Sequence, residues 1–585
     1  MSCFMKKMNI IVLVKPTPYK SIVDKDGNVV RTKIKNIISK DDKCAIEEAL
    51  KIKEKTNGKI CSISMSVKNN IKVLKDILAY GVDDAILLND SVFAGSDTNA
   101  TSYILSQAIR KMKSDLIICG KTSSDSATSQ VGIGVAVKLD IPFLYNVIEI
   151  IDIHNEVIRC KTINENKYEI IECKFPCVII VNNTINIPRI PTINNRLIAA
   201  KKEIITWDST NIKVDPSKCG FKGSVTSVIK TTPLIMNKKA KMIDGTKSEK
   251  ACKLLNIMNR CFFNDKTYDE YIKKNKDNLE YWIYDNDFIS TCKLIAKCYK
   301  LNNKAKIVVV TYNNCNNKLF KYGADKIINI NISDDNYIIR AKTLENLVRE
   351  RNPNVFLFNK STEGKILSAY LASKLNLGLS ADCIKLELDG NNKLVQIRSA
   401  YGGTMLANII SKNCQTQMAT VLPNDEKLVY NENNNGEIEI INNNISNKDI
   451  NILEKSIIKE TYLDKEIIIA CGIGAIKQLD NLKEISRLLN ASIGITRNVC
   501  DKDYLNNNYL IGQSGKITNS KVYLAFGISG ALEHVVGINS DIVISINTDC
   551  KAPIVKISDY YINEDVNEFI PILLNKLREE KNEKR

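Results

Sequence analysis

Glycines near the C-terminus are spaced as in turns that hold phosphate groups. Gly472-Ile-Gly474 follows the apolar run Glu466 to Cys471, and Gly527-Ile-Ser-Gly530 follows a second run, Val522 to Phe526. Each run predicts a buried strand, and the glycines that follow let the backbone approach a ligand closely. A helix is expected after Gly530, where unpaired N–H groups favour a phosphate. Many strand-to-helix turns carry two glycines, so this motif alone is a weak indication of a ligand site.

Further turns in the same segment carry hydrogen-bond donors. Thr496-Arg497 follows one strand-like run, Asn547 ends another, and Ile511 to Lys516 forms a second glycine-rich loop. Turns at the carboxyl ends of successive parallel strands can converge on one crevice, where such sheets usually bind their ligand. His534 lies in the helix expected after Gly530; considered alone, it is more typical of a solvent-exposed helical histidine.

The elements that must position these turns alternate along the chain. The segment from Asp41 to Lys55 has apolar residues on one helical face, and Ser39 can cap that helix. Apolar β-branched runs on either side of it predict buried strands at Ile10–Val14, Ile60–Met65, Ala85–Leu88 and Leu116–Cys119. Strands that alternate with helices predict an α/β fold with a parallel sheet covered on both faces.

Two sequence segments recur in the same order. Tyr80 to Asp90 is echoed by Tyr322 to Asn331, and Asp115 to Lys121 is echoed by Asn354 to Lys360. Both pairs are offset by roughly 240 residues, which predicts two related domains.

Polar stretches divide the chain. The Lys-rich segment 237–278 reads as a linker, and the Asn-rich loops near residues 433–444 mark the entrance to a third domain. The expected domains are therefore residues 1–236, 279–445 and 455–585, with the linker 237–278 after the first.

Composition excludes several classes of protein. The net charge is +17, but Lys and Arg are mixed with Asp and Glu and not clustered, which argues against a nucleic-acid partner. The 18 cysteines form no CxxC pair, so no zinc or iron–sulfur site is expected, and scattered thiols suit a reducing compartment. No stretch approaches the ~20 apolar residues of a membrane span. The run Asn9–Val14 is too short for a signal peptide, so we expect a cytoplasmic protein without membrane insertion.

Nearly the whole chain resembles an electron transfer flavoprotein whose beta and alpha subunits are joined in that order. The beta-like motifs are Ile46–Leu50, Phe93–Thr98, Gly120–Gly132, Pro188–Thr192 and Gly220–Ser224. The motifs similar to the alpha N-terminal domain are Gly323–Lys326, Gly378–Cys383, Tyr401–Gly403 and Gln417–Thr420. The motifs similar to the alpha FAD domain are Thr496–Arg497, Gly512–Lys516, Gly527–His534, Ile546–Asp549, Ala552–Ile554 and Asp559–Tyr560. The resemblance implies two related Rossmann-like parallel-sheet domains followed by a C-terminal α/β FAD-binding domain.

An FAD site is implied in the C-terminal third, without catalytic residues or metal ligands. Arg497 would lie over the flavin ring, where a permanent positive charge raises the redox potential. Ser514 would donate near N5 of the ring and His534 near the pyrimidine carbonyl, while Asn547 and Asp565 would reach the adenosine end. The complete implied set is Thr496, Arg497, Ile511, Gly512, Gln513, Ser514, Ser529, Gly530, Ala531, Leu532, Glu533, His534, Asn547, Asp565 and Val566.

Two positions depart from the family pattern. Ile473 stands where the family usually has an arginine, and the loss of a charge-assisted phosphate contact costs roughly 1.5–3 kcal/mol. Glu533 stands where the family commonly has glutamine, and a carboxylate near a reduced flavin would lower its potential.

The resemblance implies a second nucleotide in the N-terminal half, either AMP or a second FAD. The Ser/Thr-rich loop after Lys121 and the helix at Val131 suit phosphate, although such a loop can also be simply solvated. The segment Phe93 to Thr101 is more similar to the nicotinamide-linked branch of the family, which favours a second flavin. The implied residues are Leu13, Asp42, Met65, Gly120, Lys121, Ser124, Asp125, Thr128, Gln130 and Val131.

The loop Pro188–Asn194 resembles the segment with which the family anchors acyl-CoA dehydrogenases, with Ile193 at the apolar anchor position. An ordinary hydrophobic loop contact is the alternative. The resemblance also admits other redox partners, such as ferredoxin or flavodoxin.

Three functions remain open at this point. The first is an FAD-dependent electron carrier, for instance in fatty acid beta-oxidation. The second is a bifurcating enzyme that oxidises NADH at a second flavin. The third, suggested by Ile473, is an adenine-nucleotide-binding protein without redox activity.

Overall fold

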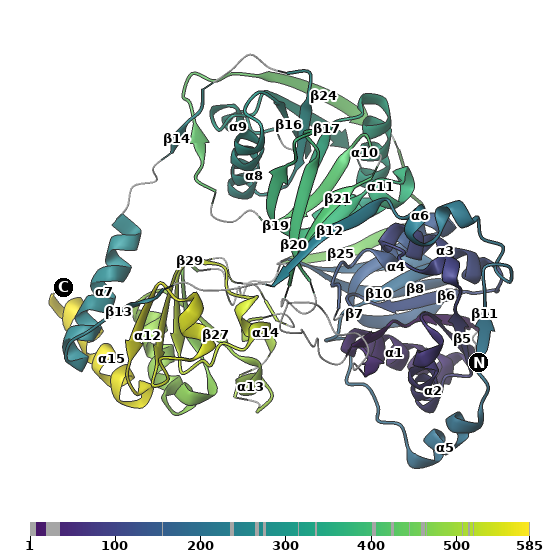
Figure 1. Ribbon diagram of the computed structural model, residues 1–585, viewed down its shortest axis with the longest axis horizontal. Coiled ribbons are helices and arrows are strands. Elements are labelled where there is room, and N and C mark those ends of the chain that lie inside the picture. Colours follow the sequence, from purple (N-terminus) through teal and green to yellow (C-terminus); the bar gives the residue numbers. More distant parts are fainter. Residues whose placement is uncertain are drawn as a thin grey trace. The chain divides into compact units, whose positions relative to one another are not determined.

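In the computed structural model, the chain divides into two compact units (Figure 1). The structure describes residues 7–18, 35–123, 125–154, 156–165, 167–233, 239–263, 268–272, 277–313, 315–333, 336–400, 405–412, 414–422, 426–443, 445–457, 463, 465–502, 504–505, 507–512, 515–516, 518 and 520–583. The first unit comprises Met1–Thr232, Tyr268–Tyr401 and Met405–Ile458, and the second comprises Pro233–Thr267, Gly402–Thr404 and Lys459–Arg585.

The first unit begins with a ten-stranded sheet, which with its helices is called the first repeat. Its order is β11-β5-β4-β1-β6-β10-β7-β8-β9-β25. The bounds are β1 Asn9–Leu13, β4 Lys59–Met65, β5 Asp84–Leu88, β6 Leu116–Gly120, β7 Phe143–His154, β8 Val157–Asn164, β9 Lys167–Lys174, β10 Cys177–Val181, β11 Ile205–Trp207 and β25 Ile450–Ile457. The four strands expected from apolar runs are β1, β4, β5 and β6, which confirms those predictions to within a residue.

Helices cover both faces of this sheet, as continuous apolar strands require. Ile10 and Val12 of β1 face α1 (Lys40–Thr56) and α2 (Ile71–Ala79), whereas Ile11 and Leu13 face α3 (Thr98–Arg110) and α4 (Val131–Leu139). The cap predicted for α1 is confirmed, because Ser39 Oγ accepts from the backbone N–H of Asp42 at 3.1 Å.

The second repeat has a sheet of the same topology. Its order is β12-β21-β20-β19-β22-β18-β15-β16-β17-β24, so β17-β16-β15-β18-β22-β19 corresponds to β5-β4-β1-β6-β10-β7. The bounds are β12 Thr226–Pro233, β15 Glu280–Tyr284, β16 Lys306–Tyr312, β17 Lys326–Ile332, β18 Val355–Asn359, β19 Leu379–Leu388, β20 Leu394–Ala400, β21 Met405–Ser411, β22 Gln417–Val421 and β24 Glu437–Asn443. The recurring segments fall on β5 and β17 and on β6 and β18, which confirms the repeat.

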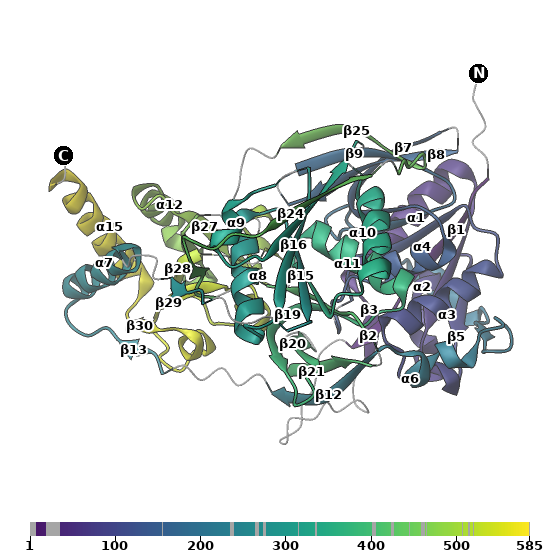
Figure 2. The same cartoon turned by 90° about the horizontal axis from the view of Figure 1, so that it is seen from above.

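Each repeat contributes a strand to the other sheet. β12, which follows the first repeat in the chain, lies beside β21 at the edge of the second sheet, and β25 pairs antiparallel with β9 at the edge of the first (Figure 2). The repeats also share a core in which α3 and α4 pack near α11 (Thr362–Leu375). Gly134 lets α4 approach α3 closely, since a Cβ there would lie 2.4 Å from Ser102 Oγ, and its carbonyl accepts from Ser373 Oγ of α11 at 3.2 Å.

The second unit is built on a six-stranded parallel sheet, with order β13-β30-β29-β28-β26-β27. The bounds are β13 Lys241–Met242, β26 Ile467–Cys471, β27 Ser492–Ile495, β28 Ser520–Phe526, β29 Ser540–Asn547 and β30 Tyr560–Asn563. The helices α7 (Lys247–Phe263), α12 (Leu479–Leu488) and α15 (Val566–Glu583) share one core with this sheet.

The segment 237–278 does more than link two domains. β13 forms an edge of the six-stranded sheet, and α7 buries Leu254, Leu255 and Met258 in the core of the second unit. Lys250 Nζ of α7 also lies 2.6 Å from Glu564 Oε1. The polar sequence concealed this role because only one narrow face of α7 is apolar. None of the helices in the described portion of the chain has the length and apolar character that crossing a membrane requires.

Candidate functional site

The candidate ligand site of the second unit lies where its strand order reverses. The chain passes from β26 to β27 on one side and then returns to β28 on the other. Ligands of open parallel sheets bind outside the carboxyl ends of the strands at such a switch point. The two predicted glycine turns follow β26 and β28, so the structure places both at this point.

The two turns pack backbone against backbone. A Cβ on Gly472 would lie 2.1 Å from the carbonyl oxygen of Gly527, and one on Gly527 would lie 2.7 Å from the backbone N of Ala475. Gly527 also has φ +61°, and Gly474 donates to its carbonyl at 3.3 Å. No side chain fits between the turns, so their main chains lie in direct contact at this edge of the sheet.

Thr496 and Arg497 lie at the same edge of the sheet. Thr496 follows β27 and donates from its backbone N–H to the carbonyl oxygen of Cys471 at 3.2 Å, directly beside the first glycine turn. Arg497 begins the short helix α13 (Arg497–Cys500), and its Nη1 lies 3.6 Å from Asp501 Oδ1. The structure therefore brings a permanent cation to the carboxyl edge, as predicted from the sequence order.

Asn547, the last residue of β29, stabilises the second glycine turn by hydrogen bonds. Its Nδ2 donates to the carbonyl oxygen of Ile528 at 2.8 Å, and its Oδ1 accepts from the N–H of Asp549 at 3.0 Å. The Ser529 carbonyl accepts from the N–H of Ile554 at 3.1 Å, and Gly530 has φ +85°. These bonds fix the turn, so Asn547 has a structural role besides the predicted contact with adenosine.

The helix expected after Gly530 is α14 (Leu532–Val535), a single turn. Its dipole is therefore small, and the expected helix contribution to phosphate binding is weaker than the sequence suggested. Ser529, Ala531 and Glu533 are exposed around it.

His534 is not the solvent-exposed helical histidine that its sequence position alone suggested. It is 6% exposed. Its Nδ1 lies 3.1 Å from the carbonyl oxygen of Ile511, and its Nε2 lies 2.8 Å from the hydroxyl of Tyr523 in β28. Both ring nitrogens thus have protein partners, and a hydrogen bond to a flavin carbonyl would require one of these partners to be exchanged. Burial lowers the pKa of His534 to about 4.

The remaining predicted FAD residues lie around the same edge. Gly512, with φ +132°, donates to the carbonyl oxygen of Lys516 at 3.1 Å, while Gln513 and Ser514 lie outside the described residues. Asp565 follows β30 and accepts from the N–H of Asn567 at 2.8 Å, so its carboxylate caps α15. Val566 is buried in the core, which leaves only its backbone for a ligand.

The first repeat has a second candidate site at the carboxyl ends of its strands. Leu13, Met65 and Gly120 end β1, β4 and β6, and the strand order reverses between β1 and β6. Asp42 lies beside this point, and its Oδ2 accepts from the N–H of Lys15 at 3.1 Å. Burial raises the pKa of the Asp42 carboxyl to about 7.

The loop after β6 is held by charged residues that the sequence did not reveal. Lys15 Nζ lies 2.6 Å from Asp125 Oδ2, and Asp41 Oδ2 accepts from both the N–H and the hydroxyl of Thr122. The only sequence signal that could have identified Lys15 and Asp41 as contacts of this loop is their position: Lys15 follows β1, and Asp41 lies at the start of α1. Lys121, Asp125 and Thr128 lie partly exposed on this loop, and Ser124 lies outside the described residues.

Gln130 occupies a buried position where the two repeats meet. Its Oε1 accepts from Thr98 Oγ1 at 2.6 Å, and its Nε2 donates to the carbonyl oxygen of Leu379 in the second repeat at 3.4 Å. Val131 begins α4 directly after it. Gln130 therefore joins the loop after β6 to the second repeat.

Ile193 is 80% exposed at the start of α5 (Ile193–Lys201). The exposed side chains of Ile187, Ile190 and Leu197 belong to the same segment. Arg189 holds the loop in place, because its guanidinium pairs with Glu47 of α1 at 2.9 Å. The predicted anchor is thus an exposed apolar side chain on a fixed loop.

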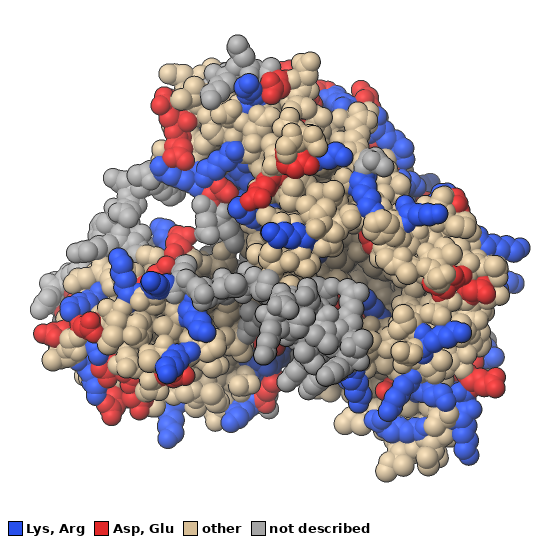
Figure 3. Space-filling model, in the orientation of Figure 1, with Lys and Arg blue, Asp and Glu red and all other residues tan. Residues whose placement is uncertain are grey.

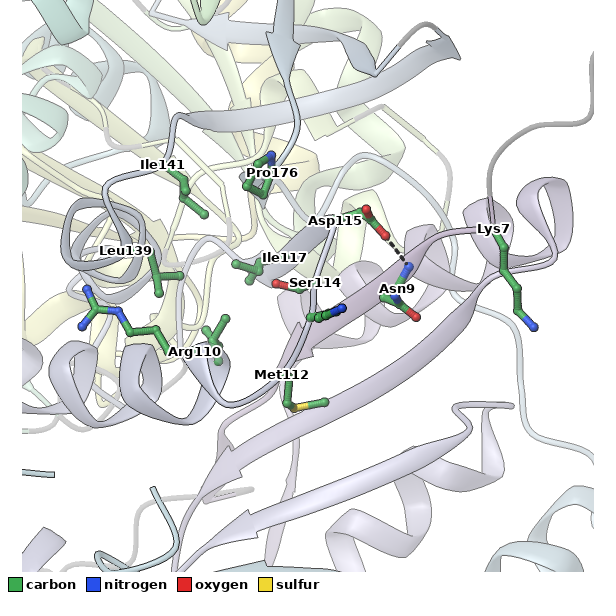
Figure 4. Close-up of a pocket in the computed structure, with 12 residues that line it drawn as sticks. Lys7, Asn9, Arg110, Met112, Ser114, Asp115, Ile117, Leu139, Ile141 and Pro176 are labelled. Atoms are coloured by element: carbon green, nitrogen blue, oxygen red, sulfur yellow. Dashed lines mark hydrogen bonds between the residues drawn. The ribbon is translucent and has the colours of Figure 1, made fainter. Parts of the chain in front are cut away.

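A cavity of about 490 Å³ lies at the opposite edge of the first sheet (Figure 4). It is lined by Asn9 and Asp115 near the amino ends of β1 and β6, and by Arg110 and Leu139 near the ends of α3 and α4. Parallel sheets bind ligands at their carboxyl edge, so this cavity is remote from the candidate sites.

Basic residues are scattered over the visible face, with acidic residues among them (Figure 3). Within each unit, the described residues visible in this view form no single extended basic surface.

Comparison with known proteins agrees with this architecture. The model of the electron transfer flavoprotein domain matches residues 26–211 and 290–444, and that of the electron transfer flavoprotein FAD-binding domain matches residues 463–539. The beta subunit of electron transfer flavoprotein from Thermoanaerobacterium thermosaccharolyticum is 36% identical over 256 residues, covering 43% of this chain and 98% of that protein. The alpha subunit from Clostridium acetobutylicum is 32% identical over 278 residues, covering 44% of this chain and 82% of that protein. The beta subunit from Megasphaera elsdenii is 36% identical over 234 residues, covering 38% of this chain and 86% of that protein. The chain therefore belongs to the electron transfer flavoprotein family, with a beta-like half and an alpha-like half, including its FAD-binding domain, in one polypeptide.

Proposed function

We propose that this protein is an electron carrier that binds FAD at the switch point of its second unit and passes electrons between partner proteins. The observation that carries the proposal is the pair of glycine turns after β26 and β28, whose backbones leave no room for a side chain. Main chain presented in this way can approach the diphosphate of a dinucleotide closely. When bound, FAD supplies the reversible redox chemistry.

Arg497 is proposed to set the potential of the cofactor. Its guanidinium stays charged at every relevant pH and lies at the carboxyl edge beside the first glycine turn. The neighbouring carboxylate of Asp501, at 3.6 Å, offsets some of that charge without removing it. A fixed positive charge stabilises the additional negative charge of a reduced cofactor and therefore raises its potential.

An anaerobic redox titration of the bound flavin tests this proposal. Arg497→Gln should lower the midpoint potential by about 30 mV or more, the equivalent of ~1.4 kcal/mol for two electrons. Arg497→Lys, which keeps the charge, should retain most of the wild-type potential. An unchanged potential in Arg497→Gln would remove Arg497 from this role, and a chain that binds no flavin in excess FAD would remove the function itself.

The first repeat, within residues 1–236, is proposed to hold the second nucleotide. Leu13, Met65 and Gly120 at the strand ends, with Lys121 and Asp125 on the following loop, support this location. The ligand is either AMP or a second FAD. A second FAD would make the protein a candidate for bifurcation with NADH as the donor, and two flavins per chain would distinguish that function from a simple carrier.

The loop that carries Ile193 is proposed as the docking point for a dehydrogenase of the acyl-CoA type. A single exposed apolar side chain can dominate a transient interface when it fills a pocket of the partner. The ion pair between Arg189 and Glu47 supports this role, since it fixes the loop before the partner arrives. Acceptors such as ferredoxin or flavodoxin also belong to the proposal.

A further inference from the structure

His534 joins two parts of the candidate FAD site. Its Nδ1 lies 3.1 Å from the carbonyl oxygen of Ile511, which begins the glycine-rich loop Ile511–Lys516. Its Nε2 lies 2.8 Å from the hydroxyl of Tyr523, near the middle of β28. Since Ile511 and Gly512 belong to the FAD residues implied by the sequence, the imidazole connects a loop of the candidate site to an interior strand of the sheet.

The same loop packs tightly against the residues of α14 and the glycine that follows them. A Cβ on Gly512 would lie 2.3 Å from the carbonyl oxygen of Glu533, and one on Gly537 would lie 2.3 Å from the backbone N of Gly512. These distances are too short for any side chain, so the two backbones are in direct contact. The place of the loop therefore depends on the place of residues 533–537, which include the buried His534.

Tyr523 is fixed by its place in the sheet. Its strand β28 lies between β26 and β29, and Tyr523 is in register with Ile468 on one side and with Val543 on the other. Its side chain is fully buried. A side chain on an interior strand is held more precisely than one on a loop, so the Tyr523 hydroxyl is a fixed point for the imidazole that it contacts.

The chemistry of the partners gives the direction of both hydrogen bonds. Ile511 offers only a carbonyl oxygen, so Nδ1 of the neutral His534 ring donates and Nε2 accepts. Burial raises the pKa of Tyr523 well above its usual value, so its hydroxyl keeps the proton that it donates to Nε2. Without that hydroxyl a buried ring nitrogen would lose its donor, which would weaken the attachment of the imidazole.

We propose that Tyr523 is a positioning residue of the FAD site, which acts through His534 to fix the loop Ile511–Lys516 beside the second glycine turn. In this role Tyr523 sets the place and the tautomer of the imidazole. The imidazole in turn holds Ile511 and Gly512 in the position that FAD binding requires. The inference rests on the FAD site proposed above, and it adds to that site a residue that the resemblance did not imply.

A double-mutant cycle on FAD affinity tests the proposal in the full-length chain. Tyr523→Phe keeps the buried ring and removes only the hydroxyl, so it should weaken FAD about three- to ten-fold, the range expected for one hydrogen bond. His534→Ala should weaken FAD at least as much. Because Tyr523 acts through the imidazole, adding Tyr523→Phe to His534→Ala should cause no further loss. Quenching of flavin fluorescence measures the four affinities.

Hydrogen exchange of the chain without FAD gives a second readout, which needs no bound flavin. The amide of Gly512 donates to the carbonyl oxygen of Lys516 at 3.1 Å, so its exchange reports on the order of the loop. Tyr523→Phe should speed exchange at Gly512 about three-fold or more and leave the amides of β28 unchanged. Tyr561→Phe is the matched control, since its hydroxyl lies 3.2 Å from Met242 Sδ in the same sheet. Its loss should change neither FAD affinity nor exchange at Gly512.

Several results would overturn the proposal. These are equal FAD affinity in wild type and Tyr523→Phe, an equal loss in Tyr561→Phe, or unchanged exchange at Gly512 in Tyr523→Phe. Additive losses in the double variant would show that Tyr523 supports the core of the second unit and does not act through His534. Should His534→Ala fail to fold, the comparison of Tyr523→Phe with Tyr561→Phe decides alone. A wild-type chain that binds no FAD would contradict the electron carrier, and exchange at Gly512 would still test the attachment of the loop.

Discussion

At the scale of single residues, the surroundings of His534 fix its protonation state. The carbonyl oxygen of Ile511 can only accept, so Nδ1 carries the proton, and Nε2 then accepts from the hydroxyl of Tyr523. Burial lowers the pKa of His534 to about 4, which keeps the ring neutral at physiological pH. The imidazole therefore joins β28 to the loop at Ile511 and does not act as a cation there.

We expect His534 to stay neutral from pH 5 to 8. The chain has only 2 histidines, so NMR spectra of His534→Gln and His154→Gln assign both imidazole signals. Because the folded pKa of about 4 lies below the unfolded value of about 6.5, the unfolded chain binds more protons between these limits. The contribution of His534 to the free energy of unfolding is therefore fully present above pH 6.5, and it falls by up to about 3 kcal/mol as the pH drops to 4. The His534→Gln variant should not show this decrease. A His534 signal that titrates near pH 6.5 would contradict this account.

Ile473 offers a second test at this scale. Its side chain is 39% exposed in the first glycine turn, so an arginine can replace it without disturbing the core. Ile473→Arg should tighten FAD binding about ten-fold or more, since a charge-assisted phosphate contact contributes about 1.5–3 kcal/mol. Quenching of flavin fluorescence measures the affinity. The control, Ile289→Arg, adds the same charge at an exposed isoleucine of the first unit, and an equal gain there would show that only net charge matters.

Sequence order was sufficient to place several candidate site residues, but not the residues that they contact. Thr496 and Arg497 follow β27 and Asn547 ends β29, so their position at the carboxyl edge could be predicted. The burial of His534 could not, because Tyr523 and Ile511 approach it only in the folded sheet. The contact between the repeats in which Arg398 Nη2 donates to the carbonyl oxygen of Ser126 at 2.7 Å could not be predicted either, because 272 residues separate the two.

At the scale of elements, the turn after β28 depends on glycine at position 527. Its φ of +61° favours glycine, and a Cβ there would press on the backbone of Gly474 and Ala475. Backbone cannot move aside as a flexible side chain can, so any substitution must shift one of the two turns.

Gly527→Ala should therefore destabilise the second unit by about 1–3 kcal/mol and weaken FAD binding. Urea unfolding monitored by flavin fluorescence measures both effects. Gly390→Ala is the control, since a Cβ at Gly390 meets nothing within 4 Å, and its stability should stay close to that of wild type. Normal FAD affinity in Gly527→Ala would show that the close packing of the turns is not needed for binding.

Elements with a strong apolar pattern could be predicted, whereas elements that depend on distant neighbours could not. β1, β4, β5, β6 and α1 follow directly from their sequences. The expected helix after Gly530 is only four residues long, and α7 lies within the predicted linker.

The beta subunit of Thermoanaerobacterium thermosaccharolyticum matches 43% of the 585 residues, about 252, which is longer than the beta-like domain expected over residues 1–236. We propose that the beta-like sequence continues through β13 and α7 into the second unit.

At the scale of the whole molecule, the exchange of β12 and β25 interlocks the two repeats. Each sheet has an edge strand from elsewhere in the chain, which covers backbone groups that would otherwise be exposed. A single polypeptide fixes the ratio of the two halves and raises their effective concentration. The repeat itself could be predicted from the recurring segments, but the exchange could not, because a short polar strand does not specify its partner in sequence.

The two units have separate cores, and two probes can follow them independently. Both tryptophans, Trp207 and Trp282, belong to the first unit, whereas a bound flavin reports on the second. We expect tryptophan and flavin fluorescence to give different urea midpoints. Free FAD at 100 times its Kd should add about 2.7 kcal/mol to the flavin transition alone. Coincident transitions that shift together would show that the units unfold as one.

The central claim is that this chain holds FAD for electron transfer, and the absorption spectrum of the purified protein tests it most directly when the released nucleotides are quantified after denaturation. The account predicts a flavin spectrum with one FAD per chain in the second unit and a second nucleotide, AMP or FAD, in the first repeat. A colourless protein that takes up no flavin from excess FAD would contradict the account and would leave a chain with the family's fold but without its redox chemistry.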